Sequence, residues 1–515
     1  MHTVDWLVVA IYLIGMLAIA ARLARTQATD RDYFLGGNQM TPLPLATSTI
    51  ATQCSTNSLL GAPAFVGFAA GGGLLWLQYE LAVPIAMLLL VWLLATVRRS
   101  GAVSVYAFLE DRLGTRTRLL ASGMFLVFRG VATGVTVYGV AIMVGLIVDV
   151  TYTQAVLLLM AVTIIYDVLG GMRAVVYSDV VQLVLIVATV ALCLFLVVED
   201  IGGWSVLLEF QSTDPRGAAI DYSWGVGDDG NFGFWPMLFG GLFLYMAYYG
   251  CDQSQAQRVL SSRTAGEAER VLMIAGTLRF PIVLLYCLLG LALAVYAAQT
   301  PQFLDALPKT GAGSTNFNLV VPAYVLETFP VGLVGLVMVG IAAAAMSSID
   351  SSLNALSAAT GQDFLSRSRR WSPSYNFVAA KVATFVWGAV AVLFSYQVEN
   401  IAPTILEAIN KIGSVANGPL LALFVVALLA PSVGERRAIA GFAAGFGVNL
   451  VLWLGDVPIS WLWWNVTGCI SALAVTLALG PFERARLEHS AGGSTVLVLV
   501  SCAAGIFGLC AWLTA

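Results

Sequence analysis

Charge is the scarcest property of this sequence. Asp, Glu, Lys and Arg make up only 10% of its 515 residues, against about a quarter in soluble globular chains. Hydrophobic residues make up 59%, and the mean hydropathy is +0.87. So little charge excludes a soluble enzyme, a disordered scaffold and a nucleic-acid-binding protein. The long apolar runs instead indicate that the chain lies in a lipid bilayer.

Histidine and paired cysteines are also nearly absent. The two histidines, His2 and His489, lie near the chain ends, so the sequence offers neither a buried histidine proton relay nor a histidine metal site. The seven cysteines lie in apolar stretches without a CxxC pair, which indicates small core residues rather than a disulfide framework. No HExxH motif and no paired nucleophile and base is present. We therefore expect no enzymatic activity.

Fourteen long apolar segments predict an all-α, polytopic membrane protein. They cover residues 4–22, 42–68, 74–97, 119–148, 152–169, 174–198, 233–256, 271–298, 322–361, 375–397, 402–430, 438–455, 459–481 and 494–513. Basic residues follow the first segment instead of preceding it, which distinguishes this segment from a cleaved signal peptide.

The basic residues predict how the segments are oriented. If the N-terminus is outside, twenty of the 25 Lys and Arg residues fall on the inner side, Arg258 among them. Only Arg216 and Lys309 fall in outer loops. The remaining three lie within apolar segments: Arg129, Arg279 and Lys411. Because Lys and Arg are retained on the cytoplasmic side, we expect a multi-pass plasma (inner) membrane protein with both termini outside.

The predicted crossings suggest an inverted repeat. Segments two to six begin on the inner side, whereas segments seven to eleven begin on the outer side, as in transporters built from two repeats of opposite orientation. We therefore expect one transmembrane domain over residues 1–515. Its parts are a leading helix (4–22), a first repeat (42–198), a second repeat (233–430) and C-terminal helices (438–513).

Two segments carry signs of a broken helix. Residues 49–58 of the second segment are almost continuously small or polar, which suits either an unwound backbone that binds an ion or solute, or a close-packed helix interface. In the seventh segment, Tyr245, Tyr248 and Tyr249 share one helical face near several glycines. Their hydroxyls fit a small polar solute, and an interfacial aromatic belt is the alternative.

The ninth segment contains a carboxylate among hydroxyls. Ser347, Asp350 and Ser351 share one helical face, with Ser348 beside them. These are hard oxygen ligands, which suit a small cation rather than a soft transition metal. A charged Asp in lipid costs about 3 kcal/mol, so Asp350 faces protein, water or an ion. A serine packing face with an internally paired Asp is the alternative.

Six motifs resemble, in order and spacing, those of the sodium/solute symporter family, which includes sodium/sugar, proline, sialic-acid and monocarboxylate transporters. They are DYFLGG, the polar second segment, GGMRAVVYSDVVQ, CDQSQAQRVLSS, AAAAMSSIDSSLNAL and NKIGSVANGP. The resemblance implies a LeuT-type core of five-plus-five inverted-repeat helices with flanking helices, and sodium-driven alternating access.

The resemblance also implies cation sites. The main sodium site would use backbone carbonyls and hydroxyls of five residues: Ala51, Cys54, Ala344, Ser347 and Ser348. Relatives with a second sodium use an Asp that matches Asp179 and a serine pair that here reads Asp350-Ser351. A second sodium, a proton on Asp350, and pairing of Asp350 with Arg129 all remain open.

The implied solute pocket comprises eight matched positions: Ser55, Ser58, Gln78, Glu80, Tyr245, Arg279, Asn410 and Lys411. Tyr248 and Tyr249 match an aromatic pair that closes the pocket from the inner side. Glu80 is similar to an acidic residue of sugar transporters, whereas Arg129 lies one turn from an arginine that holds a carboxylate in the sialic-acid transporter. The solute stays open between a sugar or polyol, a small carboxylate and an amino acid.

We therefore expect a sodium-coupled secondary active symporter that imports a small polar organic solute. Na+ would be the coupling ion, and no organic cofactor is expected. A proton-coupled carrier of the same fold is the nearest alternative. A membrane sensor or channel fits less well, because the inner loops are too short for an output domain. The expected partners are the solute and the bilayer, with no nucleic acid and no obligatory protein partner.

Overall fold

The described part of the chain is helical throughout. The computed structural model describes residues 2–24, 30–148, 150–228, 230–309, 313–365, 373–398, 405–430, 432–483 and 491–514. Over these ranges, β-structure is limited to isolated bridges. Ten of their helices are long and apolar enough to cross a membrane. The expected all-α membrane fold is confirmed, whereas the count of fourteen crossings is not established.

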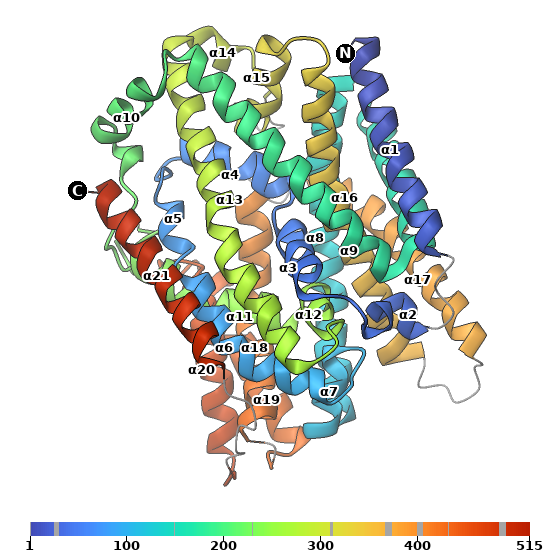
Figure 1. The fold of residues 1–515 in the computed structure, drawn as a ribbon. Helices are drawn as coiled ribbons and strands as arrows, with labels where there is room; N and C mark the ends of the chain where they lie inside the picture. The colour runs from blue at the N-terminus through green and yellow to red at the C-terminus, as the bar shows by residue number, and fades with distance from the viewer. Residues whose placement is uncertain are drawn as a thin grey trace.

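The helices follow one another along the chain as drawn in Figure 1. They are α1 (Thr3–Ala24), α2 (Asp30–Leu35), η1 (Gly36–Asn38), α3 (Pro42–Gln53), α4 (Thr56–Phe68), α5 (Trp76–Tyr79), α6 (Ala82–Arg99), α7 (Val105–Arg112), α8 (Thr115–Val148), α9 (Tyr152–Asp200), α10 (Trp204–Thr213), η2 (Pro215–Gly217), η3 (Pro236–Gly240), α11 (Gly241–Cys251), α12 (Gln253–Leu260), α13 (Ala265–Gln299), α14 (Pro301–Asp305), η4 (Phe317–Leu319), α15 (Val320–Thr328), α16 (Leu333–Ala359), η5 (Thr360–Leu365), α17 (Pro373–Ser395), α18 (Ile405–Leu429), α19 (Glu435–Leu454), α20 (Trp463–Ala478) and α21 (Gly493–Thr514).

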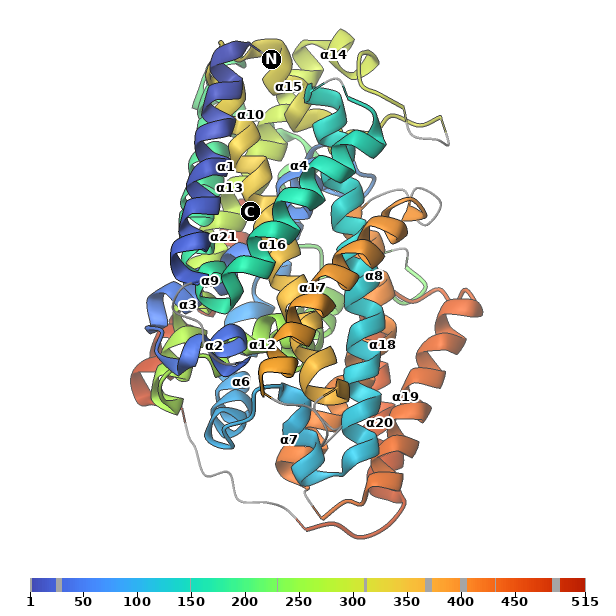
Figure 2. The same cartoon turned by 90° about the vertical axis from the view of Figure 1, so that its right-hand side faces the viewer.

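Burial separates central helices from peripheral ones. The most apolar window of the span that contains α16 is 83% buried, and α16 packs against α8 and α9. The corresponding windows of α1 and α21 are only 17% buried, and these helices lie at opposite edges of the bundle in Figure 1. Their exposed Leu and Ile side chains face the region that lipid fills. Figure 2 shows α19 and α20 side by side at another edge.

The second segment is broken, as its composition predicted. Helix α3 ends at Gln53, and Cys54 takes a non-helical conformation (φ −74°, ψ 56°) before α4 begins at Thr56. The seventh segment is broken too: α11 ends at Cys251, Asp252 is extended, and α12 follows. Both breaks lie in the packed interior, where helix ends need partners other than lipid.

Helix α9 contains the fifth and sixth predicted segments, joined by a corner at Gly171 (φ 54°, ψ −170°). The Tyr166 hydroxyl donates to Ala174 O at 2.9 Å and also bonds the Ser178 hydroxyl. In a straight helix, residues twelve positions apart would lie about 18 Å apart. The two halves therefore fold back at the corner, and the predicted boundary near residue 171 is confirmed.

Two expectations about the segments are corrected. Residues 322–361, predicted as one helix, form α15 and α16, with Gly332 at a positive φ of 92° between them. Arg258, counted as an inner-loop residue, is only 1% exposed and lies in α12. The packing of α12 against α3 and α16 covers it, because α12 is a short amphipathic helix inside the bundle rather than a loop.

Both chain ends contact segments that the sequence places toward the outer side. The Asp5 carboxylate accepts hydrogen bonds from Gly332 N and Gly335 N, at the start of α16. The Thr514 hydroxyl accepts from Ala219 N and Ile220 N, in the long 199–232 segment. In Figure 1 the N-terminus lies at the same end of the bundle as α14 and α15.

Candidate functional site

The C-terminal end of α3 is held by the hydroxyls of α16. Ser347 Oγ donates to Ala51 O at 3.2 Å, and Ser348 Oγ donates to Thr52 O at 3.0 Å. Both hydroxyls also lie 3.2 Å from Ala344 O. The last carbonyls of a helix have no intrahelical partner, so the break after Gln53 makes these oxygens available to α16.

These oxygens fit a small hard cation. Ala51, Ala344, Ser347 and Ser348 are all buried and converge within hydrogen-bond distance of one another. The carbonyl end of α3 also carries the negative end of its helix dipole. Four of the five predicted main-site residues are thus brought together. Cys54 lies at the break itself, directly after them.

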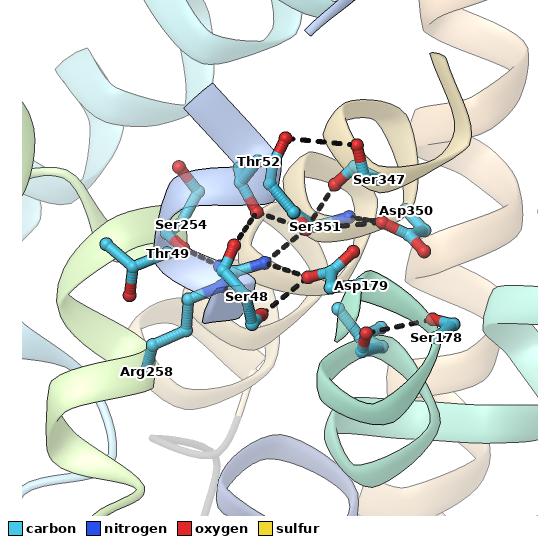
Figure 3. A network of polar contacts seen from close by, with 12 residues as sticks. Ser48, Thr49, Thr52, Ser178, Asp179, Ser254, Arg258, Ser347, Asp350 and Ser351 are labelled. Carbon is cyan, nitrogen blue, oxygen red and sulfur yellow. Dashed lines mark hydrogen bonds and ion pairs between the residues drawn. The ribbon is translucent and has the colours of Figure 1, made fainter. Parts of the chain in front are cut away.

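A buried guanidinium lies next to this group of oxygens. Figure 3 shows Arg258 of α12 reaching between Asp179 of α9 and Ser351 of α16. Arg258 Nη2 lies 3.1 Å from Asp179 Oδ2 and donates to Ser351 Oγ, and its Nε donates to Ser48 Oγ at 2.7 Å. Ser48 Oγ in turn donates to Asp179 Oδ2 at 2.5 Å. We call Ser48, Asp179, Arg258, Asp350 and Ser351 the cation cluster.

The cation cluster keeps two buried carboxylate oxygens without a hydrogen-bond partner among the described residues. They are Asp179 Oδ1 and Asp350 Oδ2. Asp350 Oδ1 accepts from Ser351 N at 2.5 Å. Both oxygens of Asp167, on the other arm of the α9 corner, are also buried and unpaired within the described ranges. Unpaired carboxylates are costly in a membrane interior, so these oxygens are candidate positions for a cation or a proton.

A cavity of about 150 Å³ adjoins the α3 break. Its wall includes Ser348. Ser348 also belongs to the oxygens at the end of α3, which we call the cation group: Ala51, Ala344, Ser347 and Ser348. Six predicted solute or gate residues line it: Ser55, Ser58, Tyr245, Tyr248, Arg279 and Asn410. Arg129 lines it as well. We call this space the solute cavity.

Glu80 does not line the solute cavity, because it forms a buried pair with Arg279. Arg279 Nε donates to Glu80 Oε2 at 2.5 Å, and Arg279 Nη2 donates to Glu80 Oε1 at 2.7 Å. The hydroxyls of Tyr245 and Tyr249 accept from the same guanidinium at 2.7 and 3.2 Å. Both carboxylate oxygens of Glu80 therefore bond Arg279. Tyr249 bonds the same guanidinium and does not line the solute cavity.

Two further predicted residues lie elsewhere. The Gln78 amide donates to Phe232 O at 2.7 Å and accepts from Asp221 N at 3.2 Å, so it anchors the segment before η3. Lys411 lines a separate polar cavity of about 300 Å³ between α18 and the α19–α20 connection. Its ammonium lies 5.9 Å from the Trp464 ring centre.

A second cavity of about 110 Å³ shares a wall with the solute cavity. Arg129, Tyr248 and Asn410 line both spaces. Arg129 forms an ion pair with Asp252, and its guanidinium lies 5.3 Å from the centre of the Tyr248 ring. The alternative pairing of Arg129 with Asp350 is therefore not the one the structure contains.

Sequence reasoning assigned no site role to Asp252, Arg258 or Asp167. All three carried a signal. Asp252 and Arg258 are the first and last residues of the polar run DQSQAQR inside an apolar segment, and Asp167 lies three residues before Gly170. A polar run at membrane depth has to line a cavity or meet buried partners. The spacing alone did not indicate which partners these would be.

Comparison with known proteins identifies sequence relatives. The sodium/sialic acid symporter NanT of Aliivibrio fischeri is 25% identical over 492 residues, which cover 94% of this chain and 94% of the relative. Human sodium-coupled monocarboxylate transporter 1 is 29% identical over 457 residues, covering 86% of this chain and 72% of the relative.

Solved structures show the same fold. A sodium-coupled sialic acid symporter in a substrate-bound, outward-open state superposes with a TM-score of 0.83 at 24% identity, over 94% of this chain and 99% of that one. Mhp1, a nucleobase-cation-symport-1 transporter, superposes less closely, with a TM-score of 0.55 at 13% identity. It covers 85% of this chain and 91% of its own.

The family description "sodium:solute symporter family" matches residues 33–445. This range contains the α3 break, the cation cluster and both cavities that meet at Arg129. The chain therefore belongs to the sodium:solute symporter family and is a sodium-coupled transporter, not an enzyme.

Proposed function

We propose that this symporter imports a small organic solute that carries a carboxylate, by alternating access across the plasma membrane. The observation that carries the proposal is the position of Ser348, which belongs to the cation group at the end of α3 and also lines the solute cavity. A sodium ion bound there orders one wall of the cavity. By linkage, the solute then raises the affinity for sodium to the same degree.

The sodium ion binds between α3 and α16 in this proposal. Its ligands are the carbonyl oxygens of Ala51, Cys54 and Ala344 and the hydroxyls of Ser347 and Ser348. The present hydrogen bonds place the hydroxyls of Ser347 and Ser348 3.2 Å from Ala344 O, and that of Ser347 3.2 Å from Ala51 O. Cys54 directly follows the end of α3. Sodium replaces the hydroxyl-to-carbonyl bonds without any rearrangement of the helices.

Arg129 selects the carboxylate. Arg279 is held by two hydrogen bonds to Glu80. Arg129, which also lines the solute cavity, binds Asp252 through Nη2 and has an Nε without a partner among the described residues, so it can bind a second carboxylate. Ser55 and Ser58 line the cavity at the start of α4, beside the positive end of that helix dipole, which favours an anionic group. This set favours a sugar acid, a short carboxylate or an amino acid over a neutral sugar.

A second cation accompanies the sodium at Asp179, Asp350 and Ser351. The unpaired oxygens of Asp179 and Asp350 receive it, and either a second sodium or a proton satisfies their charge. Each sodium that moves down a tenfold gradient and 100 mV supplies about 3.7 kcal/mol. The number of coupled cations therefore sets how strongly the solute is concentrated.

Uptake in proteoliposomes tests the sodium site. Replacing external sodium by choline at fixed pH should abolish uptake of a carboxylate solute such as lactate or N-acetylneuraminate. Ser347→Ala should raise the sodium concentration for half-maximal uptake about tenfold, because one hydroxyl ligand is lost. Ser357→Ala is the matched control, since that α16 hydroxyl bonds Ala380 O instead.

Two results would contradict the proposal. Uptake that persists in choline and follows the proton gradient would show a proton-coupled carrier of the same fold. An unchanged sodium dependence in both Ser347→Ala and Ser348→Ala would refute the assignment of the main site.

A further inference from the structure

The boundary between the two cavities consists of few side chains. The 110 Å³ cavity extends past Arg129 and Tyr248 to Tyr106 of α7 and to Cys251. Helix α7 follows the basic residues Arg98 and Arg99, which the charge pattern places on the cytoplasmic side. This second cavity is therefore the inner one, and a solute released inward has to pass Arg129 and Tyr248.

An ion pair closes this boundary. Arg129 of α8 binds Asp252 through its Nη2, and the two side chains are only 15% and 17% exposed. The Tyr248 ring packs on the guanidinium, and the Tyr248 hydroxyl accepts from Gln255 Nε2 at 2.8 Å. Arg129 Nε is buried and has no partner within the described ranges, so the guanidinium keeps a free donor.

Asp252 also links this boundary to the cation cluster. Its Oδ1 accepts from Ser254 N at 2.8 Å and from Ser254 Oγ at 2.6 Å, so Asp252 caps the N-terminus of α12. The last turn of the same helix carries Arg258, which binds Asp179 and Ser351. An eight-residue helix is about 12 Å long, so one short rigid element is anchored by charge at both ends.

We propose that Asp252 is a positioning residue that occupies Arg129 in place of the solute carboxylate, and that the solute opens the inner boundary by displacing it. Arg129 then keeps a carboxylate partner throughout, while Asp252 keeps its bonds to Ser254 N and Ser254 Oγ. A neutral solute leaves Asp252 in place. The freed N-terminus of α12 moves away from α8, and Arg258 transmits this movement to the cation cluster.

This inference rests on the proposed carboxylate solute, yet its first test needs no transport. A cysteine introduced by Thr136→Cys in the wall of the solute cavity, with Cys251→Ala to remove the thiol of the inner cavity, reports inward access. The readout is the rate of labelling by a membrane-impermeant thiosulfonate in inside-out vesicles with sodium.

Asp252→Asn should raise the labelling rate about tenfold, because the ion pair is lost. Asn is also a good N-cap residue, so α12 should stay folded. The matched control is Asp214→Asn, which likewise removes a capping Asp paired with an arginine, but in the outer 199–232 segment. It should leave the rate unchanged. The exchanged variant Arg129→Asp/Asp252→Arg should return labelling to its slow rate.

Lactate and N-acetylneuraminate test the displacement step, with glycerol as a neutral probe. The carboxylates should accelerate labelling of the parent protein, and glycerol should not. Neither carboxylate should act on the exchanged variant, where the guanidinium has moved. Labelling of Asp252→Asn at the parent rate would overturn the boundary, and equal effects of glycerol and the carboxylates would overturn the displacement step.

Failure of the proposed function gives a different result. If sodium-dependent uptake is absent while Asp252→Asn still opens the inner side, the transport proposal fails and the boundary stands. If uptake is sodium-dependent but no variant changes labelling, the transport proposal stands and the proposed boundary fails.

Discussion

The buried charges have different roles, although sequence composition treats them alike. Glu80 and Arg279 form a two-bond pair shielded by Tyr245 and Tyr249. Such a pair joins the start of α6 to the middle of α13 and leaves no free carboxylate oxygen for a solute. Arg129, in contrast, has an Nε without a partner in the part of the chain that the structure describes, and it lines the solute cavity. We therefore expect the Glu80–Arg279 pair to stabilise the fold and Arg129 to take part in solute binding.

We expect Glu80→Gln to lower the free energy of unfolding by about 3–5 kcal/mol, because it leaves the Arg279 guanidinium buried without its counter-charge. Thermal denaturation in detergent micelles measures this loss. The double variant Glu80→Leu/Arg279→Met should recover part of it, since both charges are removed together. Glu267→Gln, which breaks a partly exposed pair with Arg263, should cost less than about 1 kcal/mol. Equal losses in both single variants would refute the structural role of Glu80.

A substitution of Asp350 tests whether a second cation binds at this residue. Asp350→Asn removes the charge of a buried carboxylate whose Oδ2 has no partner among the described residues, while it keeps the shape of the side chain. We expect the variant to bind sodium with a Hill coefficient that falls toward one and to lose any pH dependence of uptake. A wild-type stoichiometry measured in the variant by reversal potentials would exclude Asp350 as a cation position.

At the scale of helices, the breaks expose polar backbone groups inside the bundle. Helix α3 stops where its carbonyls meet α16, α11 stops where Asp252 caps α12, and α9 turns back at Gly171. Each break places polar backbone or a cap at membrane depth, where only protein partners can satisfy it. The cation group and the inner boundary both lie at such ends.

Gly171→Ala should destabilise the α9 corner by about 1–3 kcal/mol, because φ 54° with ψ −170° is a region that only glycine adopts readily. The measurement is the melting temperature in detergent, together with the yield of folded protein. Gly123→Ala in α8 is the control, since a Cβ there would meet no atom within 4 Å. A larger loss for Gly123→Ala than for Gly171→Ala would contradict the described corner.

An outer-segment ion pair predicts a pH effect. The Arg216 guanidinium bonds the Asp214 carboxylate at 2.8 Å, which lowers the pKa of Asp214 below its usual value. Arg216 also donates to Gly67 O at 2.7 Å, at the end of α4. Because the folded pKa is the lower one, the anchor contributes above the ordinary carboxyl pKa of about 4 and is lost as pH falls through the folded value.

Hydrogen exchange of residues 214–217 measures this anchor. Protection should be constant from neutral pH down to about 5 and should fall below about 4, after correction for the intrinsic exchange rate. Asp214→Asn should show weak protection at every pH and no step. A step of equal size in Asp214→Asn would assign the change to another group.

At the scale of the whole molecule, the contacts of the two ends bear on topology. Asp5 binds the start of α16, and Thr514 binds the 199–232 segment. We expect both ends to face the outside. Epitope tags at the N- and C-termini should therefore bind antibody in intact spheroplasts without permeabilisation. Antibody binding only after permeabilisation would reverse the predicted orientation, and with it the assignment of the inner cavity.

The sequence alone indicated the all-α membrane fold, a break within residues 49–58 and the hydroxyl face of residues 347–351. Hydropathy, small polar residues and helical spacing are local properties, so they can be read within one segment. Helical spacing placed Ser347 beside Ser348 and Asp350 on one segment, whereas the family resemblance alone implied that Ser347 and Ser348 meet the carbonyls of the second segment. Composition also excluded a soluble protein, because charge is so scarce.

Only the tertiary structure decided which buried charges are partners. Glu80 and Arg279 are 199 positions apart, Arg129 and Asp252 are 123 apart, and Asp179 and Arg258 are 79 apart. Such pairings depend on how α6, α8, α9, α12 and α13 pack around α3 and α16. Periodicity within a segment contains no information about that packing. For this reason the charges that the sequence left as one group separate into the Glu80–Arg279 pair, the cation cluster and the Arg129–Asp252 pair.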